Sequence, residues 1–276
     1  LAKCDTIKEN KHWMSTENRM LAVNSGTSGE LAKDVFFAYR GYRMNYYAVT
    51  AMLARVYCWA GEYGNAYKEA KEVVDATYST GSTSTASCFN FSNSLTTNRK
   101  DYNSIIMTFF KSTCYEDYLP YMTKGNDVVL VVNTTNLFGD EAGADDRNLD
   151  LFGDWDGGDI KYSFKYDIKE GTSGTDMIPA IRLSEMYYIM GEYFAYKDEF
   201  SKVGEMLDKV RYARGISTTN LASSIGSLEV FHTHLIKEMR REFVGEGQMF
   251  FQYKRLDQKP KDNVVFVFDK PNNEDI

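Results

Sequence analysis

The sequence predicts a mainly α-helical protein whose helices flank an irregular middle with a few short β-strands. Two observations lead to this fold class. Apolar residues recur at helical spacing in the first part of the chain and again after Asp176. Between these parts, polar loops and short β-like runs replace the helical period. We therefore expect a single domain over 1–276, with helices in 1–80, a loop-rich recognition region in 81–175 and a helical region in 176–276.

Residues 46–76, YYAVTAMLARVYCWAGEYGNAYKEAKEVVDA, predict a helical hairpin. Two helical periods are separated by Gly61, and small alanines would let the two helices approach closely. The residues at inward spacing are Leu53, Ala54, Tyr57, Ala66, Ala70 and Val73. Several of these positions match the offsets of a tetratricopeptide repeat, so we predict tetratricopeptide-like helices here. One such repeat cannot bury its own face, and neighbouring elements must cover it.

The middle of the chain combines a polar loop with three β-like runs. Ser, Thr and Asn dominate residues 81–104, which predicts a long surface loop. Short runs suited to strands follow at 105–110, 127–132 and 160–167. The last run alternates apolar residues with Lys161, Ser163, Lys165 and Asp167, so we expect a strand with one covered face.

Three further helices are predicted after Asp176. Each shows a broad apolar face at helical spacing, and glycines stand where the second and third should end. Their apolar faces run through 181–194, 200–210 and 228–243, with Gly215 after the second and Gly245 and Gly247 after the third.

Composition and charge exclude some classes of function. The formal net charge is −7 and no basic patch is present, which argues against nucleic acid, because phosphate binding needs clustered Lys and Arg. No apolar run approaches the roughly 20 residues that cross a bilayer. The start, LAKCDTIKEN, shows no hydrophobic segment that could act as a signal peptide. We expect neither nucleic-acid binding nor a membrane-crossing segment in this chain.

The cysteines predict no metal site. Cys58 lies in an apolar helical pattern and is expected to be a buried thiol, whereas Cys4, Cys88 and Cys114 are far apart without metal-ligand spacing. The tetrapeptide ending at Cys4 superficially resembles a lipid-modification box. We reject that interpretation, because no apolar segment precedes it and Lys3 replaces the small residue that such a site prefers.

Charged residues within the predicted helices raise the question of catalysis. Arg182, Glu185 and Glu192 stand among apolar side chains, where an unpaired charge is costly. Seven residues of helix separate the two glutamates by about 10 Å, which fits poorly the carboxylate pairs of glycosidases, about 5 to 9.5 Å apart. Arg182 is the better partner for Glu185, at a spacing of three residues. We predict no catalytic residue here, but structural ion pairs where helices meet, together with the charges of 238–246.

No cofactor is predicted. The acidic run at 139–159 is interpreted as a solvated loop, with a structural calcium ion as the alternative, because Ca²⁺ binds clusters of carboxylates and carbonyls. His12 is isolated, and His232 and His234 would point to different sides of a helix, so neither a zinc site nor a catalytic triad is predicted.

Aromatic residues in the middle region are the candidate ligand contacts. Trp155 lies in the Gly- and Asp-rich stretch GDWDGG, and an exposed tryptophan flanked by carboxylates is a platform for a sugar ring. Filling a local gap is the alternative. Trp13 and Trp59 are expected in the core. The tyrosines of CYEDYLPYM are weaker candidates. The predicted ligand-binding set is Trp155, Asp154, Asp156, Tyr115, Tyr118 and Tyr121.

Five segments together resemble one family. The helical hairpin, DDR at 145–147, IPAIRLSEMYYIMGEYF, LDKVRYARG and EMRREFVGEGQMFFQYKR occur in the order and approximate spacing of the SusD-like (RagB/SusD) outer-membrane lipoproteins of Bacteroidetes. Arg182, Glu185 and Tyr187 match the R-L-x-E-x-Y pattern of that family. The stretch 241–255 resembles its closing R-E-F-x-x-E-G signature. The resemblance covers roughly residues 40–276.

The chain also departs from that family. Its members are usually close to twice this length and begin with a lipid-bearing cysteine, so the chain is similar to a member that lacks its N-terminal part. Gln248 and Met249 stand where the signature commonly has Arg and a neighbouring residue. The tail VVFVFDKPNNEDI only loosely resembles the closing proline-rich element.

The resemblance implies a SusD-like helical fold and a glycan-binding, non-enzymatic lipoprotein at the surface of the outer membrane. It also implies a SusC-like TonB-dependent transporter as partner, with membrane attachment only through a lipid anchor that this chain does not contain. Ligand contacts in that family come from variable loops and cannot be transferred by motif.

Three alternatives stay open. The same loops would suit a peptide or glycoprotein cargo. A tetratricopeptide-type scaffold would instead hold a partner polypeptide in its groove. A carbohydrate-active hydrolase would need two carboxylates converging in one cleft, for which the sequence offers only loop acids.

Overall fold

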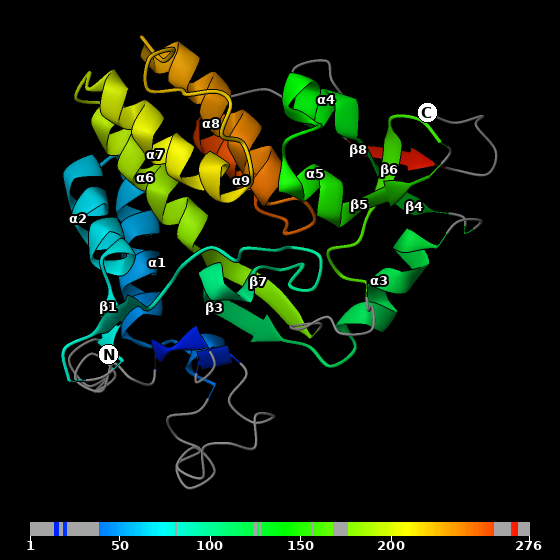
Figure 1. The fold of residues 1–276 in the computed structure, drawn as a ribbon, viewed down its shortest axis with the longest axis horizontal. Coiled ribbons are helices and arrows are strands. Elements are labelled where there is room, and N and C mark those ends of the chain that lie inside the picture. The colour runs from blue at the N-terminus through cyan, green and yellow to red at the C-terminus, as the bar shows by residue number, and fades with distance from the viewer. Residues whose placement is uncertain are drawn as a thin grey trace, which may run out of the picture.

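The structure is a computed structural model that describes residues 14–16, 19–20, 39–80, 82–123, 126, 128–155, 157–167 and 176–256, and the backbone of 266–269. Helices predominate in this part of the chain, as the sequence predicts. Figure 1 shows the longer helices gathered on one side, with shorter helices and a small sheet on the other. Cys4, His12, Trp13 and Asp156, which the sequence singled out, lie outside the described residues.

The predicted hairpin is present as α1 (Tyr46–Trp59) and α2 (Tyr63–Val74). Asn45 begins α1, because its side chain accepts a hydrogen bond from the Ala48 N–H at 3.0 Å. The alanines at 54, 66 and 70 are fully buried, as their spacing predicts, and allow the helices to approach closely. Two predictions were wrong. Leu53 is 39% exposed and Trp59 is 44% exposed, because both lie on the outer face of α1.

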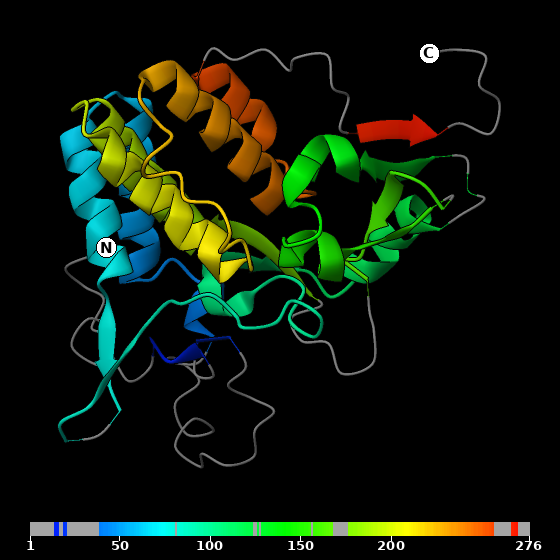
Figure 2. The ribbon, with the colours of Figure 1, turned by 45° about the horizontal axis from the view of Figure 1, so that its top comes forward.

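Four helices form the rest of the helical part. These are α6 (Leu183–Ala195), α7 (Phe200–Ala213), α8 (Leu228–Glu242) and α9 (Met249–Arg255). α6 packs between α2 and α7, and α8 lies against α6 and α7 (Figure 2). Gly215, with a φ of 83°, follows α7 at the predicted stop, and the Ser227 side chain caps α8.

Residues 177–182 form a strand where the sequence predicted helix. This strand, β7 (Met177–Arg182), pairs antiparallel with β3 (Ile105–Phe110), with Ile178 opposite Phe109. Met177 and Ile181 would be buried in either structure, so the apolar pattern did not separate the two. Pairing with β3, which lies far away in sequence, decides in favour of the strand.

The second sheet has four strands in the order β5 (Phe152–Asp154), β6 (Ile160–Ser163), β4 (Val129–Asn133) and β8 (Phe266–Asp269). All neighbouring pairs are antiparallel. Short helices surround this sheet: α3 (Cys114–Met122), α4 (Thr134–Phe138) and α5 (Asp146–Leu151). β1 (Thr77–Ser79) and β2 (Thr85–Ser87) form a separate hairpin, and 3₁₀ turns occupy Arg40–Tyr42, Tyr102–Ser104 and Gly139–Glu141.

β6 is shorter than the strand predicted over 160–167. It ends at Ser163, and Lys165, which was expected on the exposed side, is 3% exposed. The Lys165 ammonium donates to the carbonyls of Glu242 and Val244 at 3.0 and 3.1 Å and pairs with Glu246 at 2.8 Å. These partners hold the lysine inside the protein.

The segment 81–104, predicted as a surface loop, is exposed only in part. Phe89 and Leu95 are each 3% exposed, and Arg99 and Asp101 are also buried. Polar side chains can be buried here because they have partners in the protein; the Asp101 carboxylate, for example, accepts from Arg214 at 2.7 Å.

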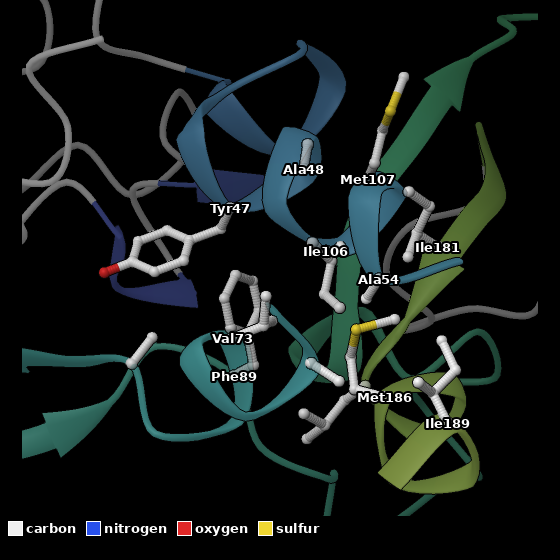
Figure 3. Packing of buried hydrophobic residues seen from close by; sticks show 14 of the residues in the cluster. Tyr47, Ala48, Ala54, Val73, Phe89, Ile106, Met107, Ile181, Met186 and Ile189 are labelled. Carbon is white, nitrogen blue, oxygen red and sulfur yellow. The ribbon is translucent and has the colours of Figure 1, made fainter. Parts of the chain in front are cut away.

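The main hydrophobic core lies between the hairpin, α6 and the β3–β7 pair. Figure 3 shows Ala54 and Val73 of the hairpin facing Ile106 of β3, Ile181 of β7 and Met186 of α6. A second cluster joins α6, α7 and α8. None of the helices in the described part of the chain is both long and apolar enough to span a bilayer.

Candidate ligand-binding site

The buried charges of the molecule form ion pairs that join the helical part to the middle region. Glu242 of α8 is 3% exposed, and its carboxylate accepts from Arg214 at 2.5 Å and from Arg147 at 3.2 Å. Burial alone would raise the pKa of Glu242, but Arg214, Arg147 and Arg182 outweigh it and hold that pKa far below its usual range. Glu242 is therefore an ionised structural anchor.

The three charges that raised the question of catalysis take part in such pairs. Arg182 lies 2.7 Å from Glu246, so the predicted pairing of Arg182 with Glu185 was wrong, because Arg182 belongs to a strand. Glu185 instead accepts two hydrogen bonds from Arg55 of α1, both at 2.6 Å. Glu192 pairs with Arg255 of α9 at 2.5 Å. The prediction that these charges join helix to helix is confirmed for Glu185 and Glu192, whereas Arg182 joins a strand to the segment after α8.

The acidic run supplies further members of this network. Asp145 is fully buried and holds Arg147 at 2.7 Å, and Glu141 binds Arg241 at 2.7 Å as well as Arg211. The prediction of a solvated loop was therefore wrong for Asp145 and Glu141. Among the described residues, no three His, Cys, Asp or Glu side chains gather as metal ligands.

A pocket of about 640 Å³ opens beside α3. This volume falls in the range of sites for small ligands, roughly 300 to 1,000 Å³. α3 supplies most of its wall, Leu130 comes from β4, and Ile178 comes from β7. The lining residues are Lys111, Cys114, Asp117, Tyr118, Tyr121, Leu130 and Ile178. Burial raises the pKa of the Cys114 thiol, which is therefore protonated and acts as part of the apolar wall.

Tyr118 is a rigid part of this wall. Its ring stacks on Tyr166 with centroids 4.0 Å apart and planes 10° from parallel. The hydroxyls of Tyr118 and Tyr166 both donate to the Gly245 carbonyl, at 3.2 and 3.1 Å. Gly245 has a φ of 72°, and a Cβ there would approach the Tyr166 ring to 3.3 Å, so glycine suits the position best. Stacking and hydrogen bonding together fix one face of Tyr118 and leave the pocket side open.

Tyr121 and an ion pair complete the rim of the pocket. Tyr121 is 49% exposed. Lys111 and Asp117 form a salt bridge of 2.6 Å, and the Thr113 hydroxyl donates to the same Asp117 oxygen at 3.1 Å. The hydrogen bond between them raises the pKa of Lys111 and lowers that of Asp117, so both are charged at neutral pH. Sequence reasoning missed Lys111 and Asp117, although Lys111 precedes the selected tyrosines and Asp117 lies among them.

The structure brings together only part of the predicted ligand-binding set. Tyr118 and Tyr121 line the pocket, whereas Tyr115, on the same helix, is half-buried and does not. Trp155 follows β5, is half-buried and lies edge-on to Tyr162 with centroids 6.5 Å apart. Asp154 is exposed, 3.7 Å from Lys161. Neither Trp155 nor Asp154 lines this pocket, and ligand binding by all of these residues stays a prediction.

The fold and the pocket define a mainly helical protein, with a tetratricopeptide-like hairpin, that presents an aromatic pocket beside α3. Residues 37–272 match the sequence model of the SusD family, and the chain belongs to this family. A search of functionally curated proteins finds no match to the chain.

Solved structures of the same superfamily share this fold. A SusD superfamily protein from Bacteroides thetaiotaomicron has a TM-score of 0.58 and 21% identity, over 83% of this chain and 56% of that one. A SusD-like carbohydrate binding protein from Bacteroides vulgatus has a TM-score of 0.55 and 18% identity, over 83% of this chain and 52% of that one. The surface glycan-binding protein A from Bacteroides uniformis has a TM-score of 0.54 and 15% identity, over 80% of this chain and 52% of that one. The chain thus spans about half the length of these relatives.

Proposed function

We propose that this protein is a non-enzymatic, surface-exposed outer-membrane protein that binds glycans and delivers them to a SusC-like TonB-dependent transporter. The observation that carries the proposal is the pocket beside α3, where the rigid Tyr118 and the exposed Tyr121 stand next to charged hydrogen-bonding groups. Aromatic faces and a few polar groups are what a sugar-binding site needs. The names of the relatives from B. vulgatus and B. uniformis, a carbohydrate binding and a glycan-binding protein, support it further.

Binding without hydrolysis is favoured by the carboxylates. Glycoside hydrolysis uses two carboxyl groups that flank one bond. Among the residues that line the pocket, Asp117 is the single carboxylate, and it is held by Lys111. The buried carboxylates Glu185, Glu192 and Glu242 are committed to arginines.

Delivery to a transporter requires a surface for a protein partner. The outer face of α1 exposes Leu53, Val56 and Trp59, which follow one another at intervals of three residues and form an apolar stripe. Apolar residues gathered on one helix face are typical of partner contacts. The stripe supports the transporter part of the proposal. It would equally suit the partner of a tetratricopeptide-type scaffold.

Isothermal titration against soluble polysaccharides, with peptides as controls, tests the proposal. We expect saturable binding to at least one glycan, and no release of reducing ends on prolonged incubation. Binding to peptides alone would favour the peptide-cargo alternative instead. The appearance of reducing ends would contradict the non-enzymatic assignment.

The variant Trp155→Ala tests whether the turn between β5 and β6 contacts the ligand in addition to the pocket beside α3. If Trp155 stacks on the ligand, the variant weakens glycan binding by about 1 to 3 kcal/mol, as expected for an aromatic anchor. Titration of the variant beside Tyr121→Ala measures both contributions. Unchanged affinity for Trp155→Ala, with a loss for Tyr121→Ala, would confine the site to the pocket beside α3.

A further inference from the structure

The charges that line the pocket beside α3 cancel. Lys111 and Asp117 are the charged residues among its lining, and they form one ion pair. Lys100 is buried and does not line the pocket. An anionic ligand such as a phosphate, a sulfate or a uronic acid gains most from unpaired cations. Here it would have to compete with Asp117 for Lys111, so a neutral ligand is the better match.

The ion pair still has hydrogen-bonding capacity to offer. The Oδ2 atom of Asp117 accepts from Lys111 and Thr113, whereas its Oδ1 atom has no hydrogen-bond partner within the described part of the chain. The Lys111 ammonium carries three N–H groups and uses one of them on Asp117. An acceptor and a donor are therefore presented side by side at the rim.

Two hydroxyls on neighbouring carbons of a sugar ring match this arrangement. One hydroxyl can donate to Oδ1 of Asp117 while the oxygen of the next accepts from Lys111. Hydrogen bonds to charged groups are stronger than those between neutral groups. The pair is therefore suited to a vicinal diol, which phosphates and most peptide side chains lack.

The remaining wall suits the opposite side of the same ring. Tyr121, Leu130 and Ile178 are aromatic or aliphatic, and Tyr118 is held rigid by Tyr166. The C–H face of a pyranose ring is apolar and packs on such surfaces. Phe109 pairs with Ile178 across β3 and β7, so both side chains lie on one face of the sheet, and Phe109 is 56% exposed. Phe109 thus extends the apolar surface beyond a single sugar ring.

We propose that the pocket beside α3 binds a neutral oligosaccharide through a vicinal diol that Asp117 and Lys111 hold at the rim, with the ring packed on Tyr121. This inference rests on the proposed glycan binding and names the chemistry of the ligand. It assigns a ligand-binding role to two residues that sequence reasoning passed over.

The test compares two sets of probes by isothermal titration. The neutral set is maltohexaose, cellohexaose, laminarihexaose, xylohexaose and mannohexaose, and the acidic set is oligogalacturonate and a heparin hexasaccharide. We expect the tightest binding within the neutral set. Tighter binding of an acidic probe would overturn the proposal, and silence of every probe and of larger polysaccharides would overturn the proposed function together with it.

Variants then test the two residues with the best neutral probe. Asp117→Ala and Lys111→Met should each weaken binding by about tenfold or more, as expected for a lost hydrogen bond to a charged group. The double variant should lose less than the product of the two effects, because one diol couples them. Asp75→Ala, which removes the carboxylate of the surface pair with Lys71, is the matched control and should leave affinity unchanged.

Unchanged glycan affinity in Asp117→Ala, Lys111→Met and the double variant would overturn the diol proposal and leave the proposed function standing. Both residues are about half exposed, so the variants are expected to fold. An unchanged thermal midpoint checks that they do. Tyr121→Ala gives an independent check, because a ligand that packs on the Tyr121 ring must bind less tightly when that ring is removed.

Discussion

The buried pairs around Glu242 and the surface pair of Lys111 with Asp117 use the same chemistry in opposite surroundings. The side chains of Glu242, Arg214 and Arg147 are each 2% exposed, and they bond to one another and to further buried carboxylates. Lys111 and Asp117 are 47% and 49% exposed and retain donors and an acceptor that point at no other residue of the described chain. Burial turns an ion pair into a structural joint, because breaking it leaves a desolvated charge. Exposure leaves the pair available to a ligand.

The largest effect on stability is expected from the removal of one buried carboxylate. Glu242→Ala leaves Arg214 and Arg147 without their shared partner, so we expect the free energy of unfolding to fall by about 3 to 5 kcal/mol. Denaturant unfolding followed by circular dichroism measures this. Asp75→Ala, at a surface pair, is the control and should change it by less than about 1 kcal/mol. Equal effects of the two variants would show that burial does not separate these pairs.

Acid should weaken the buried network selectively. Burial raises the pKa of Glu141, but Arg241 and Arg211 outweigh it and lower that pKa to about 2, from an ordinary value of 4.5. A carboxyl group whose pKa is lower when folded stabilises the protein above its unfolded pKa, and this contribution is lost as the pH falls through the folded value. We expect stability to decline from about pH 4.5 towards pH 2. Unfolding measured at several pH values should show a shallower decline for Glu141→Gln.

The smallest effect on stability is expected at the surface pair. Lys111→Met and Asp117→Ala remove charges that water solvates well, so their thermal midpoints should stay at the value of the unchanged protein. Differential scanning calorimetry measures this. A large drop in either midpoint would make the pair structural and weaken its assignment to the ligand.

Much of the helical architecture could be predicted from the sequence. The spacing of Ala54, Ala66 and Ala70 gave the hairpin, and Gly215 marked the end of α7. Errors arose where partners distant in sequence decide the structure. Residues 177–182 form a strand because they pair with β3, and Lys165 is buried because its ammonium group forms an ion pair with Glu246. Local periodicity carries no information on such partners.

The candidate site was predicted only in part for a similar reason. Aromatic content selected Tyr118 and Tyr121, which do line the pocket. Its other walls come from Leu130 and Ile178, on strands separated from α3 along the chain, and no local pattern could have named them. Lys111 and Asp117 did carry a local signal, as opposite charges on either side of the start of a helix.

β7 continues into α6 without a connecting loop, because Arg182 ends the strand and Leu183 begins the helix. Six residues of strand and thirteen of helix, each about 20 Å long, thus follow one another as a continuous segment. This segment carries part of the pocket wall at Ile178 near one end, while Glu185 and Glu192 pair with arginines of α1 and α9. The pocket wall at Ile178 is thus joined through one continuous segment to the ion pairs that fix α1 and α9.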